Sequence, residues 1–87
     1  MSNSVKILYF AWLRERLGIE EEEVDLPVDI TTATALFSWL KARDERFEMA
    51  LENPDIVNVA VNQVHVAHDE IFDAPREIAL FPPMTGG

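Results

Sequence analysis

The clearest periodic pattern in the chain is a helical stripe that ends near Arg43. Apolar residues stand at positions 33, 36, 37 and 40, which is the i, i+3, i+4, i+7 spacing of an amphipathic helix. Thr31 and Thr32 precede the stripe as candidate N-caps, and the basic Arg43 suits the negative end of a helix dipole. The pattern therefore predicts one long helix over about residues 33–43.

Five shorter segments show the β-rich, partly alternating pattern that is typical of strands. They cover residues 5–10, 24–26, 57–61, 64–67 and 77–81. Asn62-Gln63 separates the third segment from the fourth and suits a tight hairpin turn. Pro27 and Pro82 each follow a predicted strand. We expect each proline to end its strand, because proline has no N–H to donate to a ladder.

Two short helices complete the expected order of elements. Residues 11–17 carry helix formers and precede Gly18, at a position where the left-handed conformation costs least for glycine. Residues 46–51 form the other, before the helix breaker Pro54. This order predicts an α+β, β-grasp (ubiquitin-like) fold, with a mixed sheet of about five strands and one long helix packed across it. We expect the first and last strands, which are the most apolar, to lie side by side at its centre.

The charge balance restricts the classes of partner. The 87 residues contain 16 acids against 7 lysines and arginines, a net charge of -9. We expect no nucleic-acid partner, because phosphate binding needs clustered cations. The acidic run 20–23 is expected to lie in a loop that leads into the second strand and to form a solvated face. No apolar stretch approaches the ~20 residues of a membrane span, and residues 1–4 lack a secretory signal pattern, so we expect a cytoplasmic protein without a membrane contact.

The side chains offer little for catalysis by the chain itself. The sequence has no cysteines, which excludes disulfides, thiolate metal sites and a cysteine nucleophile. His65 and His68 are the only histidines, and their spacing along a strand disfavours a shared metal ion. No phosphate-binding glycine loop or nucleophile elbow is present. We therefore expect no bound cofactor, no metal, and a protein that is non-catalytic alone.

The tail formed by residues 82–87 is unusual for the end of a small domain. It closes on Gly86 and Gly87, and glycine costs more backbone entropy to order than any other residue. One interpretation is a frayed terminus. The other is a thin probe of about 20 Å, at ~3.3–3.6 Å per residue, that enters another protein's active site. An enzyme there would convert the Gly87 carboxylate into an acyl-adenylate, which a sulfur or nitrogen nucleophile can attack. Glycine suits this reaction because it has no Cβ to block the attack.

Three segments resemble the ubiquitin-like sulfur carriers that serve as small subunits of molybdopterin synthase. They are Val5-Lys6-Ile7-Leu8-Tyr9-Phe10-Ala11 with Leu13-Arg14-Glu15 and Gly18, then Val59-Ala60-Val61-Asn62-Gln63, and Ile78-Ala79-Leu80-Phe81-Pro82-Pro83-Met84-Thr85-Gly86-Gly87. The motif F-P-P-x-T-G-G in the last segment is the most specific, since Gly-Gly alone also fits ubiquitin and the carriers of the thiamine and tRNA-thiolation pathways. The turn 73–77 departs from the family, and we expect Pro75 to replace its usual glycine-containing acidic turn.

The resemblance implies a single sulfur-carrier domain over residues 1–87. An ATP-using, E1-like adenylyltransferase would adenylate Gly87, and a persulfide sulfur donor would turn it into a thiocarboxylate. The sulfur would pass, inside the large subunit of molybdopterin synthase, to a cyclic pyranopterin monophosphate during molybdenum cofactor biosynthesis. Two carriers per dithiolene fit the family's two-plus-two heterotetramer. The tail residues that would enter the large subunit are Phe81, Pro82, Pro83, Met84, Thr85 and Gly86.

Several alternatives stay open from the sequence. Phe10 and Arg14 are candidate partner contacts. Alternatively, Phe10 packs in the core and Arg14 forms a surface ion pair. Phe37 and Trp39 are large for their positions, and either broaden the core or mark an exposed contact patch. The chain could also carry sulfur for thiamine or tRNA thiolation, act as a ubiquitin-like modifier through Gly87, or be an interaction module with an inert tail.

Overall fold

The helices and strands follow the order that the sequence predicts. The computed structural model describes residues 2–82, with side chains from Ser4 onward. The elements are β1 (Ser2–Tyr9), α1 (Trp12–Leu17), β2 (Glu21–Pro27), α2 (Ala33–Arg43), α3 (Glu45–Ala50), the 3-10 turn η1 (Pro54–Ile56), β3 (Asn58–Val61), β4 (Val64–Val66) and β5 (Glu77–Phe81). The long helix α2 has the predicted bounds, and most strand ends move by a few residues or less.

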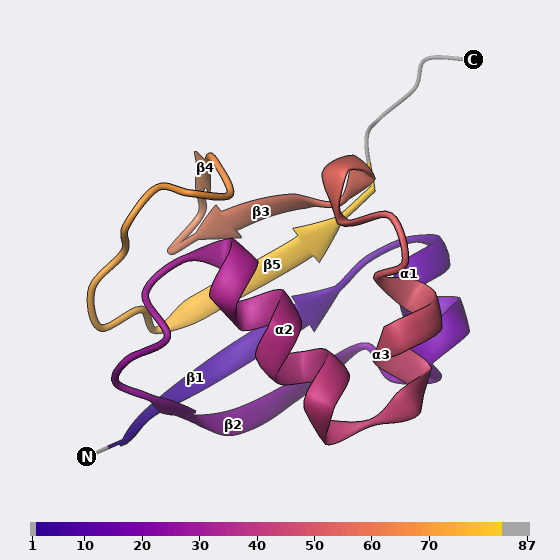
Figure 1. The fold of residues 1–87 in the computed structure, drawn as a ribbon, viewed down its shortest axis with the longest axis horizontal. Coiled ribbons are helices and arrows are strands. Elements are labelled where there is room, and N and C mark those ends of the chain that lie inside the picture. Colours follow the sequence, from indigo (N-terminus) through magenta and orange to yellow (C-terminus); the bar gives the residue numbers. More distant parts are fainter. Residues whose placement is uncertain (1, 83–87) are drawn as a thin grey trace.

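The strands form one mixed sheet with the order β2-β1-β5-β3-β4. β1 and β5 are parallel neighbours at its centre, as predicted, and the other three pairs are antiparallel. α2 crosses one face of the sheet, and β1 and β5 both end at the side where α1 lies (Figure 1). A five-stranded mixed sheet with one long helix across it is the β-grasp fold, and this prediction is confirmed.

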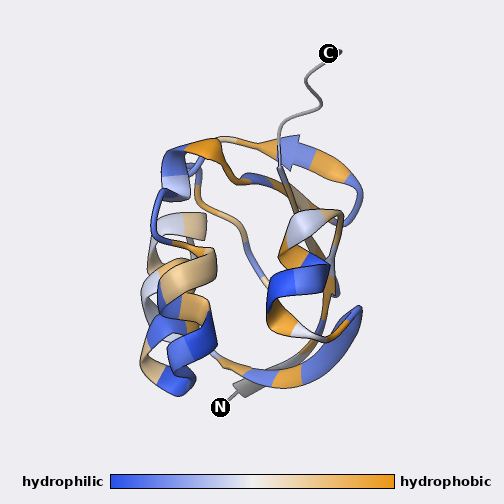
Figure 2. Ribbon diagram, turned by 90° about the vertical axis from the view of Figure 1, so that its right-hand side faces the viewer, coloured by the Kyte–Doolittle hydropathy of each residue, from blue (hydrophilic) through white to orange (hydrophobic). Residues whose placement is uncertain are grey.

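The core fills the space between the sheet and the helices. Alternate residues of the two central strands are buried there, including Ile7 of β1 and Ile78 of β5, and they meet Leu36 and Leu40 from α2. Figure 2 shows α2 and α3 on one side and the sheet on the other, with α1 at the end of the sheet, and orange and blue segments alternate along the strands. Phe37 is only 3% exposed, so it belongs to the core.

Local sequence signals set the ends of the helices. The Thr32 hydroxyl accepts a hydrogen bond from the Ala35 N–H (3.2 Å), which caps the start of α2. Gly18 ends α1 at φ 75°, in the left-handed region that costs glycine least. The Asp44 side chain accepts from the Arg46 N–H (2.9 Å) at the start of α3. Each boundary therefore has a backbone or side-chain partner for groups that the helix leaves unpaired.

The acidic run differs from the sequence expectation. Residues 21–23 are not a loop but the first part of β2, paired with β1, although Glu21 and Glu23 are exposed, as expected for a solvated face. Glu22 points toward α2, where the Tyr9 hydroxyl donates to its carboxylate (2.6 Å) and Arg43 lies 3.4 Å away. Burial, together with the Glu22 hydrogen bond and charge, raises the pKa of the buried Tyr9 phenol far above its ordinary value. The prediction of a loop was wrong because the run pairs with β1. Side chains of a strand alternate between its two faces, and Glu22 therefore meets the Tyr9 hydroxyl and the Arg43 guanidinium.

Two tight turns lie at the start of β5. Asn62 and Gln63 both have positive φ (51° and 71°), as a two-residue hairpin turn between twisted strands requires. Before β5 the chain turns at Ala74, which has φ 44°, next to the buried Pro75. None of the helices within residues 2–82 is long and apolar enough to cross a bilayer.

Candidate functional site

The root of the tail is held on both sides by the centre of the sheet. Phe81 of β5 pairs with Asn58 of β3, and the Phe10 N–H donates to the Leu80 carbonyl (3.1 Å) on the β1 side. Phe81 and Pro82 are both half-buried. A proline at this point ends the ladder, because it has no N–H. The tail thus starts from a position that neighbouring strands fix.

The other predicted tail residues lie beyond this root. They are Pro83, Met84, Thr85, Gly86 and Gly87, and all five lie outside the described residues. The structure therefore places the start of the tail and the surface around it. It brings the start of the tail next to Phe10, one of the two residues that the sequence proposed as partner contacts.

The face of the sheet that points away from α2 is lined by small and apolar side chains near the tail root. Leu8, Ala79 and Ala60 form one row across β1, β5 and β3, because Leu8 pairs with Ala79 and Ala79 with Ala60. All three are half-buried. His65 of β4 continues the row beside Ala60. The sequence did not single out this row, although the outward positions of each alternating strand identify it.

Aromatic side chains gather where this face meets the tail. Phe10 is 45% exposed, which contradicts a core position for it. The His65 ring lies 6.1 Å from the Phe81 ring, tilted by 51°, and its Nε2 lies 3.4 Å from Asn58 Oδ1. We call Phe10, His65 and Phe81 the aromatic rim. Exposed aromatic groups at one edge of a sheet are suited to protein contact.

The backbone turns sharply just after Phe10. Ala11 adopts φ 55° and ψ -133°, a conformation that a residue with a Cβ rarely takes. This turn sends the chain from β1 directly into α1, so that Phe10 stays beside β5 at the edge of the exposed face. The strain therefore lies just after β1, one residue beyond the Phe10 N–H that bonds to β5.

Arg14 forms a surface ion pair. Its guanidinium lies 3.5 Å from the Glu20 carboxylate, and the two side chains are 49% and 77% exposed. An exposed pair of this kind contributes little to stability, typically below about 1 kcal/mol. Arg14 therefore stays available to exchange Glu20 for an acidic group of a partner.

The described residues hold no arrangement suited to a metal. No three His, Asp or Glu side chains within residues 4–82 are placed to share an ion. His68 Nε2 lies 2.6 Å from the Val57 carbonyl, which makes it the donor of a hydrogen bond that joins the loop after β4 to the start of β3. His65 lies at the aromatic rim, on β4.

Comparison with known proteins adds a family to this geometry. The ThiS family pattern matches residues 7–87, which is nearly the whole chain. The chain belongs to the ThiS family. The matched range includes both Phe10 at the aromatic rim and the tail that ends in Gly87.

Two relatives are similar to this ThiS family member over almost their whole length. The molybdopterin synthase sulfur carrier subunit of Escherichia coli (strain K12) is 39% identical, over 95% of this chain and 99% of that protein. The subunit of the same name from Dictyostelium discoideum is 36% identical, with both chains fully covered. Similarity over the full length shows that the tail and the β-grasp body are shared together.

Solved structures confirm the ubiquitin-like β-grasp fold of this ThiS family member. SAMP1 from Haloferax volcanii superposes with a TM-score of 0.70 at 31% identity, over 98% of this chain and 100% of that one. A putative molybdopterin converting factor, subunit 1, from Pyrococcus furiosus gives 0.69 at 32% identity, over 95% and 100%.

Proposed function

We propose that this ThiS family member is the sulfur carrier of a molybdopterin synthase, with Gly87 as the residue that bears the sulfur. The single observation that carries the proposal is the fixed root of a Pro-Pro-Met-Thr-Gly-Gly tail, held between β1 and β3 at the centre of the sheet. The names of the similar sequences from E. coli and D. discoideum support the same assignment.

A fixed root favours threading of the tail into a partner. Prolines 82 and 83 restrict the backbone at that root, so less conformational entropy is lost when the tail enters a narrow site. The five residues after Pro82 reach about 17 Å when extended, at ~3.3–3.6 Å per residue. This length allows the Gly87 carboxylate to reach a buried active site while the β-grasp body stays outside.

The chemistry takes place on the Gly87 carboxylate and is catalysed by partners. A free carboxylate is a poor electrophile, because attack on it must expel oxide. An E1-like enzyme would transfer AMP from ATP to the carboxylate and release pyrophosphate. The terminal sulfur of a persulfide would then displace AMP, and reduction of the resulting acyl disulfide by a thiol would leave the thiocarboxylate. In the large synthase subunit this sulfur would bond to a carbon of a cyclic pyranopterin monophosphate. Water would then hydrolyse the resulting thioester, which breaks the C–S bond to Gly87 and restores its carboxylate.

The aromatic rim is the part of the body that we assign to partner contact. Phe10 is well exposed there, and Phe81 begins the tail, so one surface can hold a partner while the tail enters it. The net charge of -9 favours partners with a basic surface, because complementary potentials speed association.

Intact-mass analysis tests the proposal. The purified chain is incubated with an E1-like activating enzyme, ATP and a persulfide source. The expected product carries the mass increase of one oxygen replaced by sulfur, located at Gly87 by fragmentation. A variant that lacks Gly87 is the matched control and should stay unmodified with unchanged thermal stability. No sulfur on the unaltered chain under conditions that charge the E. coli relative would refute the assignment.

One observation favours a second candidate function, attachment to other proteins. SAMP1 of H. volcanii, the small archaeal modifier protein 1, is 31% identical over nearly the full length. A modifier would form an isopeptide bond from Gly87 to a lysine of a target. Peptide mass spectrometry of activated extracts distinguishes the two functions: after tryptic cleavage at Arg76 a modifier leaves residues 77–87 attached to target lysines, and a dedicated carrier leaves no such remnant.

A further inference from the structure

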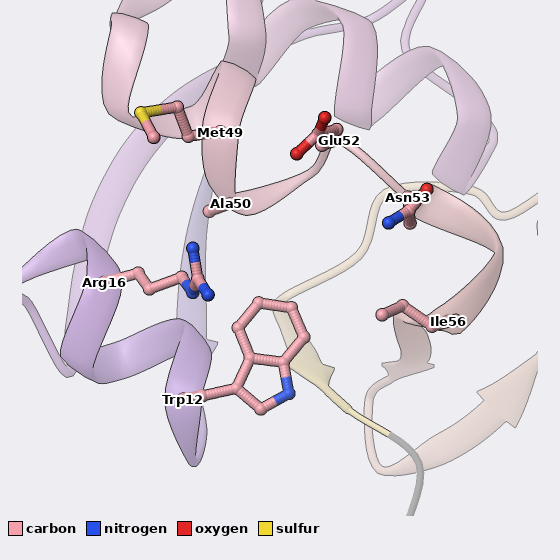
Figure 3. A pocket seen from close by; sticks show the side chains of 7 residues that line it. All are labelled: Trp12, Arg16, Met49, Ala50, Glu52, Asn53 and Ile56. Carbon is pink, nitrogen blue, oxygen red and sulfur yellow. The ribbon is translucent and has the colours of Figure 1, made fainter.

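A pocket of about 280 Å³ lies on the helical side of the molecule. Figure 3 shows Trp12 and Arg16 of α1 on one wall, and the segment from α3 to η1 on the other. The complete lining is Trp12, Arg16, Met49, Ala50, Glu52, Asn53 and Ile56. We call this the tail-root pocket. Its volume is just below the roughly 300–1,000 Å³ of small-molecule sites, so it fits a side chain better than a metabolite.

The walls of the tail-root pocket come from the two segments that flank the last strand. Trp12 follows two residues after Phe10, whose N–H bonds to Leu80. Ile56 lies two residues before Asn58, and Asn58 pairs with Phe81. β5 ends between these segments, and Figure 3 shows it passing behind the pocket. The pocket therefore lies beside the strand from which the tail starts.

The apolar lining is open to solvent. Met49 is 71% exposed and Ile56 is 45% exposed, while the Trp12 indole packs partly against the core. With Phe10 on the far side of β5, three of the six exposed large hydrophobic residues within residues 4–82 lie around the tail root. Such a concentration of apolar surface at one end of a small acidic protein is typical of a contact site.

The pocket is lined by one cation, Arg16, and by one carboxylate, Glu52. The Arg16 guanidinium lies 5.4 Å from the centroid of the Trp12 ring, as a cation–π contact. Arg16 makes no ion pair with any side chain in residues 4–82, whereas three other arginines of that range each have a carboxylate partner. A guanidinium that is held against an indole loses less freedom on pairing, so it can receive a carboxylate at a lower entropic cost.

We propose that the tail-root pocket binds an apolar side chain of the large synthase subunit, and that Arg16 pairs with a carboxylate beside that side chain. This rests on the proposed function, because it assigns the pocket to the protein that takes up the tail. The aromatic rim and the tail-root pocket then grip the partner on both sides of β5. Arg16 and Glu52 line different walls of the pocket, so a partner carboxylate is favoured beside Arg16, where a basic group would be repelled.

Binding of a purified large subunit to the full chain, measured by isothermal titration, tests the proposal. We expect Met49→Glu and Arg16→Glu each to weaken the affinity by about tenfold, as for loss of one contact at an interface. Ile71→Glu and Arg76→Glu are the matched controls at the other end of the molecule, and should change the affinity by less than about twofold. Ile71 is 76% exposed, and Arg76 directly precedes β5 at the end opposite the tail.

A charge-neutral variant separates the ion pair from packing. Arg16→Gln keeps much of the stem over Trp12 but loses the cation, so its affinity deficit should shrink as salt rises. Loss of affinity that is independent of salt would overturn the role of Arg16. Thermal unfolding of each variant checks that the fold is retained, which is expected because the Met49 and Arg16 side chains are exposed.

The other outcomes have equally definite meanings. Equal affinities for pocket variants and controls overturn the pocket proposal while the sulfur assay still decides the function. No binding of the large subunit by the unaltered chain overturns the pocket proposal as well. Self-association that Met49→Glu abolishes, with unchanged affinity for the large subunit, would assign the pocket to a second copy. Thiocarboxylation of Gly87 is read separately by mass, so failure of one proposal does not hide the other.

Discussion

Asn62 connects the hairpin turn to the start of β5, and replacing it should have a measurable cost. Its N–H donates to the Glu77 carbonyl (2.8 Å). Its side-chain Oδ1 accepts from the Arg76 N–H (2.9 Å) and from the Glu77 N–H (3.1 Å). Asn62 also has φ 51°, a conformation that asparagine tolerates better than most residues.

We expect Asn62→Ala to lower the free energy of unfolding by about 2 kcal/mol. Loss of the shared acceptor accounts for roughly 1 kcal/mol, because the two N–H groups are exposed and turn to water. The left-handed conformation accounts for roughly 1 kcal/mol more, since alanine adopts it less readily than asparagine. For a domain of this size the sum corresponds to a fall in Tm of roughly 8–15 °C.

Urea unfolding, followed by tryptophan fluorescence and far-UV circular dichroism, measures this change. Asn62→Asp is the matched control, because it keeps an acceptor oxygen and tolerates positive φ; it should stay within about 0.5 kcal/mol in salt that screens its charge from Glu77. Asn62→Gly keeps the conformation without the acceptor and should fall between the two. The reasoning is refuted if alanine costs less than about 0.5 kcal/mol, or if aspartate costs as much as alanine.

Four further predictions concern single positions. Ala11→Gly should raise the free energy of unfolding by about 1 kcal/mol in urea titrations, because strain of roughly 1–3 kcal/mol at φ 55° exceeds the entropy cost of glycine; a loss would contradict strain there. Gly18→Ala should cost about 1 kcal/mol from φ 75° alone, since the added Cβ meets nothing nearer than Arg46 Nη1 at 3.9 Å; a much larger cost would indicate a clash. Tyr9→Phe should cost about 1.5 kcal/mol, because it removes the hydrogen bond to the Glu22 carboxylate, whereas Tyr9→Leu should cost more through lost packing. The hydrogen bond from Arg46 lowers the pKa of Asp44, so the stability that the Asp44 carboxylate contributes is present above the ordinary pKa of 3.8 and is lost as pH falls below that value. Asp44→Asn should therefore lose less Tm than the unaltered chain when pH falls through this range, and an unchanged acid profile would contradict this.

Most of the fold could be predicted because its signals are local. The stripe of α2, the cap at Thr32, the glycine after α1 and the turn at Asn62 each depend on the spacing or conformation of a few neighbouring residues. The acidic strand could not be predicted in this way. Glutamate side chains favour solvent, so residues 21–23 give no strand signal of their own. They belong to β2 because they pair with β1 and because Glu22 accepts the hydrogen bond of the Tyr9 hydroxyl.

The candidate site divides in the same manner. The sequence by itself determined the tail, because a Phe-Pro-Pro start and a Gly-Gly end are matters of composition and order. It left Phe10 between core and surface, since an aromatic residue at a strand end fits either. Only the tertiary structure decided that Phe10 is exposed beside β5, and that Trp12 and Ile56, far apart along the chain, form one pocket at the tail root. The physical reason is that burial and proximity depend on which strands become neighbours, and that pairing is set by the whole sheet.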